Sequence, residues 1–291
     1  MNDLEYHIAA WAHAMEQTEY FSLDKSTPDQ LPGIWDKLSV TYDDALGSDT
    51  TRVERTLEIL ERLGALTAHT VAIDIGCGTG SFALELAQRC KLVYALDNST
   101  QMLGRLCSKA QGASNIVPIL SDWRTIEPAA LDSRINLALS CLNPAINDFE
   151  SLDKMNAVSN DWCCYINALG NSVGTNTTRN ELQEIIFGRA LKSMSGNSVT
   201  FARNIIEAVG YETELWDIPC AWNRSVGKDS AVEEIINDYS RYIQIGNETK
   251  RQIEAYVESK LDDKGLYTQA VSTTLGVVTW MRKLATPILR R

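Results

Sequence analysis

One stretch constrains the fold of this chain more than any other. An apolar run over residues 71–75 is followed at once by Gly76, Gly78 and Gly80, and then by a second apolar-rich run at 81–87. The pattern predicts a strand, a tight loop and a helix. Glycine adopts positive φ without steric cost and, because it lacks Cβ, lets a ligand approach the backbone closely. The sequence therefore predicts that this loop is part of a binding site for a nucleoside-containing cofactor.

Two further apolar runs end in acids that should lie at the same edge of a sheet. Residues 92–96 lead into Asp97, and residues 115–120 are followed by Asp122. The carboxyl ends of parallel strands meet at one edge, where an acid after the second strand can accept hydrogen bonds from ribose hydroxyls. The glycine spacing departs from the dinucleotide fingerprint at Ser81, where that fingerprint needs glycine or alanine. This difference argues against a nicotinamide or flavin cofactor.

The glycine loop and the acids of three successive strands resemble the class I S-adenosylmethionine-dependent methyltransferases. The resemblance covers roughly residues 67–170, with residues 135–140 as the fourth strand. It implies an α/β fold with a Rossmann-like, doubly wound, mostly parallel seven-stranded sheet. It also implies S-adenosylmethionine as cofactor, S-adenosylhomocysteine as product, and methyl transfer to an unidentified small-molecule acceptor.

The resemblance also implies individual roles. The three glycines match those that pack against the methionine part of the cofactor, and Asp74 matches the acid that opens their motif. Asp97 matches the ribose-binding acid, Met102 lies where an apolar side chain covers the adenine, and Asp122 matches the acid that accepts from the adenine amino group, with Trp123 beside it. For both acids the alternative is a solvated strand end or a helix cap. The predicted cofactor-binding residues are Tyr42, Asp74, Gly76, Cys77, Gly78, Gly80, Asp97, Asn98, Met102, Asp122, Trp123 and Ser140.

Residues for the acceptor are expected at the fourth-strand tip, after the fifth strand and before the first. Tyr42 follows Trp35 at seven residues, which resembles an element of small-molecule methyltransferases related to the quinone-biosynthesis enzymes; the alternative is that both rings are core. Asn143 precedes a proline as in amine-directed methyltransferases, but the second proline and the aromatic residue of that motif are missing. We therefore expect Asn143 to line the pocket, with Trp35, Cys141 and Asn167 as the other predicted acceptor residues. No catalytic residue and no metal ligand is predicted.

The remaining sequence divides around this core. Residues 1–66 predict a helical cover that precedes the first strand, and a helical insertion at about 231–261 precedes the last strand. Both are expected to lie over the acceptor pocket. The predicted units are 1–66 as N-terminal cover, 67–195 as cofactor-binding core, and 196–291 as a part that completes the sheet, with strands at 211–219 and 266–281.

Charge and cysteine content limit the partners. The formal net charge of −11 provides no basic stripe for phosphates, so nucleic acid is not an expected substrate. The acidic amino terminus is not followed by an apolar run long enough for a signal or a membrane span. Seven cysteines without Cys-x-x-Cys spacing predict neither a zinc site nor a disulfide frame. A cytoplasmic protein without a membrane partner is expected, and its oligomeric state is not predicted.

Two other function classes stay open at this stage. A nicotinamide-dependent oxidoreductase is disfavoured by the glycine spacing and by Asp122. A non-catalytic protein that binds S-adenosylmethionine or S-adenosylhomocysteine would keep every residue named above. The chemistry itself asks mainly for closeness, alignment and exclusion of water, because a sulfonium is already an activated methyl donor.

Overall fold

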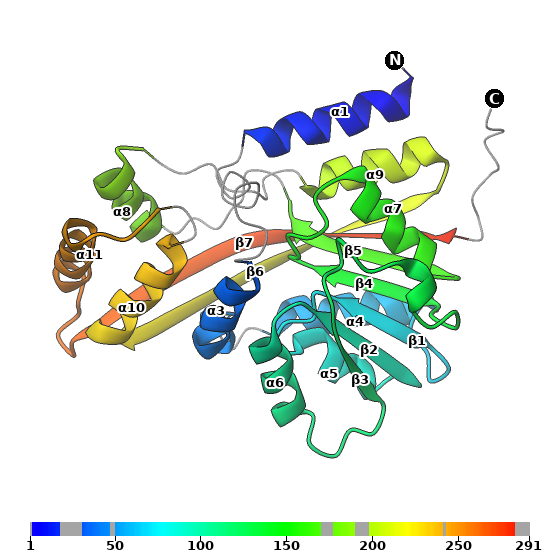
Figure 1. Ribbon diagram of the computed structural model, residues 1–291, viewed down its shortest axis with the longest axis horizontal. Coiled ribbons are helices and arrows are strands. Elements are labelled where there is room, and N and C mark those ends of the chain that lie inside the picture. The colour runs from blue at the N-terminus through cyan, green and yellow to red at the C-terminus, as the bar shows by residue number, and fades with distance from the viewer. Residues whose placement is uncertain are drawn as a thin grey trace.

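The fold is built on one seven-stranded sheet, seen in a computed structural model (Figure 1). The structure describes residues 2–17, 31–46, 50–169, 177–189, 198–240 and 243–282. Strand order is β3-β2-β1-β4-β5-β7-β6, and the first five of these strands run parallel while β7 is antiparallel to both of its neighbours. The strands are β1 Val71–Ile75, β2 Leu92–Asp97, β3 Ile116–Leu120, β4 Leu137–Cys141, β5 Trp162–Ala168, β6 Thr213–Gly227 and β7 Leu266–Met281.

Strand β1 lies at the centre of this sheet and sets the position of the functional edge. Every residue of Val71–Ile75 is buried, as expected for a parallel strand with helices on both faces. The chain passes from β1 outward to β2 and β3, then returns to β4 on the other side of β1. The strand order therefore reverses between β1 and β4, and ligands of such sheets bind outside the carboxyl ends at this point.

Helices cover both faces of the sheet. On one face α4, α5 and α6 form a core with the sheet, and on the other face α1, α7 and α9 do so. Cys163 and Cys164 of β5 are both fully buried, one in each of these cores, because successive side chains of a strand point to opposite faces of the sheet. These helices are α1 Asp3–Glu16, α4 Thr51–Arg62, α5 Ser81–Ala87, α6 Thr100–Lys109, α7 Phe149–Val158 and α9 Ser198–Val209.

A third core lies outside the central sheet, where the long β6–β7 ribbon extends beyond β5 (Figure 1). The expected insertion between the last two strands is confirmed and consists of two helices, α10 Lys228–Tyr239 and α11 Asn247–Ser259, which pack with α8 Thr177–Phe187. The expected end of the sixth strand at Pro219 is wrong, because β6 continues to Gly227. Proline lacks an N–H, but β6 pairs on one side only, so the other side tolerates the missing donor.

The helices that precede β1 take different positions. The first helix, α1, has one apolar stripe: Trp11 is buried, and Leu4, Ile8 and Met15 are partly buried in the same core. This helix packs on α9, away from the functional edge (Figure 1). Helix α3, Leu31–Leu46, instead lies against α6 beside the carboxyl ends of the strands.

Candidate functional site

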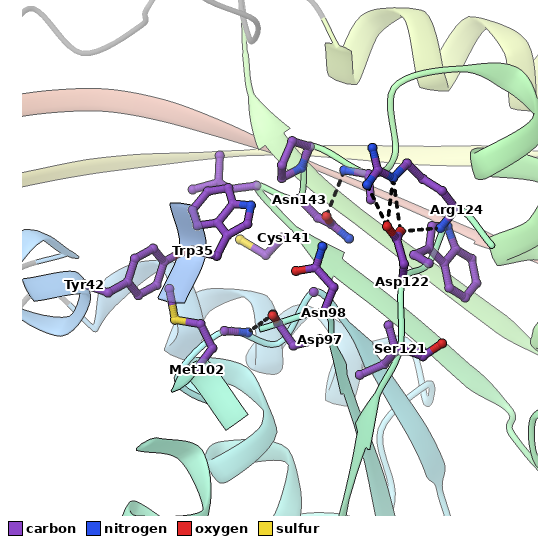
Figure 2. Close-up of a pocket in the computed structure, with 17 residues that line it drawn as sticks. Trp35, Tyr42, Asp97, Asn98, Met102, Ser121, Asp122, Arg124, Cys141 and Asn143 are labelled. Atoms are coloured by element: carbon purple, nitrogen blue, oxygen red, sulfur yellow. Dashed lines mark hydrogen bonds and ion pairs between the residues drawn. The ribbon is translucent and has the colours of Figure 1, made fainter. Parts of the chain in front are cut away.

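A cleft of about 720 Å³ opens at the carboxyl ends of β1, β2 and β4 (Figure 2). Figure 2 shows the aromatic pair of α3 on one side of it and Asp122 with Arg124 on the opposite side. The residues that line the cleft are Trp35, Tyr42, Gly76, Gly78, Leu96, Asp97, Asn98, Met102, Ser121, Asp122, Trp123, Arg124, Cys141, Leu142, Asn143, Pro144 and Ala145.

The glycine loop is fixed to β2, and two of its glycines, Gly76 and Gly78, line the cleft. The backbone N–H groups of Gly76 and Cys77 donate to the Leu96 carbonyl at 2.8 and 2.9 Å. All three glycines have positive φ, at 72°, 54° and 92°. A Cβ on Gly78 would project beside the Tyr42 ring, with its nearest neighbour 3.5 Å away, so the protein itself leaves room for a side chain at this position.

The other two glycines are required by packing. A Cβ on Gly76 would lie 2.6 Å from the Asn143 amide group, and a Cβ on Gly80 would lie 2.2 Å from a methyl of Leu106 in α6. Gly80 does not line the cleft. Its position shows why the sequence needs glycine there without any ligand: α6 approaches the loop too closely for a side chain.

Asp97 ends β2 and holds the neighbouring backbone. Its carboxylate accepts from the Gly78 N–H at 2.8 Å and from the Ser99 N–H at 2.9 Å. Burial raises the pKa of this carboxyl, and the backbone hydrogen bonds partly offset that effect. Each carboxylate oxygen keeps a second lone pair, so Asp97 can still accept from ligand hydroxyls. Asn98 and Met102 lie beside it in the cleft, as predicted.

Asp122 also lines the cleft, but a residue missed by the sequence analysis engages it. Arg124 donates to the carboxylate through its backbone N–H at 2.9 Å, Nε at 3.1 Å and Nη2 at 2.6 Å. Burial raises the pKa of Asp122, but hydrogen bonds and charge from Arg124 outweigh burial and hold the pKa below its usual range. Asp132 and Arg134 repeat this Asp-x-Arg geometry at a more exposed place, so the spacing itself was the available signal.

The Trp123 side chain is already held by contacts within the protein. Its indole N–H donates to the Ser151 carbonyl at 3.1 Å, and the ring is 2% exposed. Lys154 places its ammonium 5.6 Å from the ring centroid and donates to three carbonyls around it. The residue thus forms a rigid part of the cleft wall.

The tip of β4 supplies Cys141, Leu142 and Asn143. Burial raises the pKa of the Cys141 thiol to about 12. Leu142 has a φ of 51°, the one positive value recorded for a described residue other than glycine. After this turn, the Asn143 amide donates to the Ile75 carbonyl at 3.1 Å and accepts from the Ala145 N–H at 3.0 Å. Both ends of the amide are therefore used to hold the loop.

Five predicted residues lie outside the described lining of the cleft: Asp74, Cys77, Gly80, Ser140 and Asn167. Ser140 is fully buried and donates to the Ile75 carbonyl at 2.9 Å, which ties β4 to β1. Asn167 donates to the Tyr165 hydroxyl at 2.9 Å and accepts from the Ala168 N–H at 2.9 Å. The small polar run after it, residues 170–176, lies outside the described part of the chain.

A smaller cavity of about 360 Å³ lies next to the glycine loop and shares Tyr42, Gly76, Cys141 and Leu142 with the main cleft. Asp74 lines it together with Cys77 and two residues not predicted, Arg52 and Ser81. One carboxylate oxygen of Asp74 is buried without a hydrogen-bond partner. Burial, and second the charge of Asp97, raise the pKa of Asp74 to about 7.

Arg52 provides the positive group of this cavity. It is 8% exposed and donates from Nη2 to the Ser81 hydroxyl at 3.3 Å. Its guanidinium comes from α4, distant in sequence from the loop, so no local pattern could have pointed to it. A buried acid and a buried guanidinium thus border one cavity at the glycine loop.

Comparison with known proteins agrees with this geometry. Residues 72–158 match the family described as "Methyltransferase domain". This stretch runs from β1 to the end of α7 and so includes the glycine loop, Asp97, Asp122 and the β4 tip.

Curated relatives match over short segments. An uncharacterized protein of Haemophilus influenzae is 35% identical over 32% of this chain and 35% of its own length. A probable cobalt-precorrin-6B C(15)-methyltransferase (decarboxylating) of Methanocaldococcus jannaschii is 50% identical over 11% of this chain and 18% of its own length. The matched part of the chain therefore spans about a third of the first relative and less of the second.

Solved structures are similar over more of the chain. The YcgJ protein of Bacillus subtilis is 13% identical, with a TM-score of 0.49 over 78% of this chain and 98% of that one. A magnesium protoporphyrin IX methyltransferase of Synechocystis with bound S-adenosylhomocysteine is 17% identical, with a TM-score of 0.44 over 79% of this chain and 82% of that one.

In the part of the chain that the structure describes, no group of three or more histidine, cysteine, aspartate or glutamate side chains is arranged to hold a metal ion. No described helix is both long and apolar enough to cross a membrane.

Proposed function

We propose that this protein is an S-adenosylmethionine-dependent methyltransferase with a small-molecule acceptor. One observation carries the proposal: the open backbone at Gly78, the Asp97 carboxylate and the Asp122 carboxylate converge on one cleft, next to a buried acid with an unpartnered oxygen. A nucleoside that carries an amino-acid group with an ammonium would provide a partner for each of these four features.

The residues fit the cofactor from end to end. Asp97 would accept from the ribose hydroxyls, while Met102 and Leu96 would contact the adenine and Asp122 would accept from its amino group. The unpartnered oxygen of Asp74 is suited to the ammonium of the methionine part. Arg52, which borders the same cavity, is suited to the carboxylate.

The cofactor supplies a methyl group on a sulfonium, which needs no further activation. The chain has to hold donor and acceptor in line and to exclude water. Trp35, Tyr42 and Leu142 provide an apolar wall for the acceptor beside the glycine loop. The rings of Trp35 and Tyr42 meet edge to face, with centroids 6.5 Å apart.

The residues that would surround the methyl acceptor offer few groups that could take up a proton. The Cys141 thiol stays protonated at neutral pH because its pKa is about 12. The Asn143 amide is held by the Ile75 carbonyl and the Ala145 N–H, and the chain lacks the aromatic neighbour that would stack on a substrate amine. The described lining includes no histidine. We therefore assign these residues to positioning and shape, and we expect an acceptor atom that needs little help to lose a proton.

The overall charge of −11 supports a small molecule rather than nucleic acid as acceptor. All seven cysteines are free thiols, which supports a reducing compartment such as the cytoplasm.

The test is a transfer assay. The protein is incubated with methyl-labelled S-adenosylmethionine and a small-molecule extract, and products are separated by mass spectrometry. We expect a labelled product that disappears in Asp97→Ala. Binding of S-adenosylhomocysteine without transfer in any extract would favour a protein that only binds the cofactor.

A further inference from the structure

We propose that Asp36 and Asp43 are positioning residues that lock α3 onto the cofactor-binding wall, so that cofactor binding and enclosure of the acceptor are coupled. The proposal rests on the proposed function, because it assigns the cleft to the cofactor and the acceptor. It adds a role for two carboxylates that the binding scheme above leaves unused.

Helix α3 carries the same pair of residues twice. Trp35 and Asp36 are followed seven residues later by Tyr42 and Asp43. Seven residues make almost two helical turns, about 10.5 Å along the axis, so the two aspartates share one stripe and the two aromatic residues share the neighbouring stripe. The aromatic stripe lines the cleft (Figure 2), while the acidic stripe contacts the elements that hold the cofactor site.

Asp36 binds the start of α6. Its carboxylate accepts from the Ser99 hydroxyl at 2.6 Å and from the Gln101 N–H at 3.1 Å. The Ser99 backbone N–H in turn donates to Asp97. Helix N-termini favour negative charge, so the carboxylate of α3 and the proposed ribose-binding acid occupy the same positive end of α6. A single residue, Ser99, therefore connects the two carboxylates.

Asp43 binds the glycine loop itself. Its carboxylate accepts from the hydroxyl of Thr79, which is fully buried between Gly78 and Gly80. It also accepts from the Lys109 ammonium at 3.0 Å through both oxygens. Because the Asp43–Lys109 pair is partly exposed, the ion pair adds little, and the bond to buried Thr79 is the more important attachment.

These two attachments decide where the aromatic wall lies. Tyr42 stands against the open position of Gly78, and Trp35 meets Tyr42 edge to face. A ligand that orders Gly78 and Asp97 also orders Thr79 and Ser99, their neighbours in the chain and the partners of the two aspartates. Cofactor binding should thus tighten α3, and loss of either aspartate should loosen both the helix and the cofactor.

The experiment combines hydrogen exchange with calorimetry of S-adenosylhomocysteine binding. In the wild-type protein the ligand should slow exchange over both 76–80 and 31–46. In Asp36→Ala and Asp43→Ala, exchange over 31–46 should rise without ligand, and the dissociation constant should increase about 5- to 150-fold, the usual range for coupling between two sites. Asp36→Asn should recover most of the affinity, because its amide oxygen can still accept from both donors.

Asp148→Ala is the matched control, since Asp148 caps α7 by accepting from the Ser151 N–H at 2.8 Å. It should lower stability and leave both α3 exchange and affinity unchanged. Wild-type affinity and α3 protection in both alanine variants would overturn the coupling, and so would an Asp148→Ala variant that behaves like Asp36→Ala. If the wild-type protein itself does not bind the ligand, the proposed function fails, while exchange over 31–46 in the ligand-free variants still reports whether the aspartates hold α3.

Discussion

Replacing the loop glycines one at a time by alanine should separate their roles. Each of the three has positive φ, so each alanine variant incurs the same left-handed backbone cost of about 1–2 kcal/mol in the free energy of unfolding. What differs is the space that the new methyl group meets. Gly112 is the matched control, because it has a φ of 91° and nothing within 4 Å of its Cβ position.

The structure gives the expected order of effects. Gly78→Ala meets only ordinary contact at 3.5 Å, so its stability should fall about as much as that of Gly112→Ala, by about 1–2 kcal/mol. Gly80→Ala meets Leu106 at 2.2 Å and should lose a further 1–3 kcal/mol or so from overpacking. Gly76→Ala places its methyl 2.6 Å from the Asn143 amide and should lose a similar additional amount, about 1–3 kcal/mol, from overpacking.

Cofactor affinity should follow a different order. The methyl of Gly78→Ala enters the cleft, and an overpacking cost of about 1–3 kcal/mol corresponds to a roughly 5- to 150-fold weaker affinity for S-adenosylhomocysteine. Urea unfolding measures stability, and calorimetric titration measures affinity. Gly78→Ala should be the variant with a mild loss of stability and a large loss of affinity, whereas wild-type affinity in a folded Gly78→Ala protein would refute the assignment of this backbone to the cofactor.

Three further outcomes are expected. Asp97→Ala should weaken S-adenosylhomocysteine binding by roughly 10- to 100-fold, for about 1.5–3 kcal/mol of charged hydrogen bonding, in a protein whose circular dichroism is unchanged; unaltered affinity would show that the ribose lies elsewhere. Burial and then the charge of Asp97 raise the pKa of Asp74 to about 7, whereas a ligand ammonium favours the ionised carboxylate. Ligand binding should therefore release protons below pH 7, and the affinity should increase as the pH rises to that value. Calorimetry in buffers of different ionisation enthalpy measures the proton release, which should be absent in Asp74→Asn. Without ligand, the native state holds the Asp74 proton more tightly than the unfolded state does. The protonated carboxyl therefore adds to the free energy of unfolding below about pH 4, and this contribution should be lost as the pH rises to 7. Urea unfolding of Asp74→Asn should not show this decrease.

The sequence made the central architecture predictable because the relevant signals are local. An apolar run, three glycines and a second apolar run specify β1, the loop and α5 without distant contacts. The last strand was predicted at 266–281 and is observed as Leu266–Met281, since alternation and turn residues bound it on both sides. The acids that end β2 and follow β3 could be placed at one edge because parallel strands share their carboxyl ends.

What could not be predicted depends on contacts between residues distant in sequence. Arg52 reaches the loop through Ser81, 29 residues away, and nothing near Arg52 signals this contact. Asn143 was expected to line the pocket and does so, but its amide also holds the loop through Ile75 and Ala145, which is visible only once β1 and β4 are paired.

The position of the cover was the other expectation that local pattern could not settle. An amphipathic stripe identifies α1 as a packed helix but does not say on what it packs, and it lies on α9. The insertion helices α10 and α11 supply none of the described lining of the cleft, so among the predicted cover elements α3 is the one whose described residues line it. The helical period specifies a buried face; the partner of that face is decided by the tertiary fold.

The central claim is that the cleft holds S-adenosylmethionine rather than another nucleotide. The most direct measurement is calorimetric titration of the purified full chain with S-adenosylmethionine, S-adenosylhomocysteine and oxidised and reduced nicotinamide dinucleotides under one set of conditions. Saturable one-to-one binding of the first two, with no heat from the dinucleotides, is the predicted result. Binding of a nicotinamide dinucleotide without binding of either sulfur nucleoside would contradict the account.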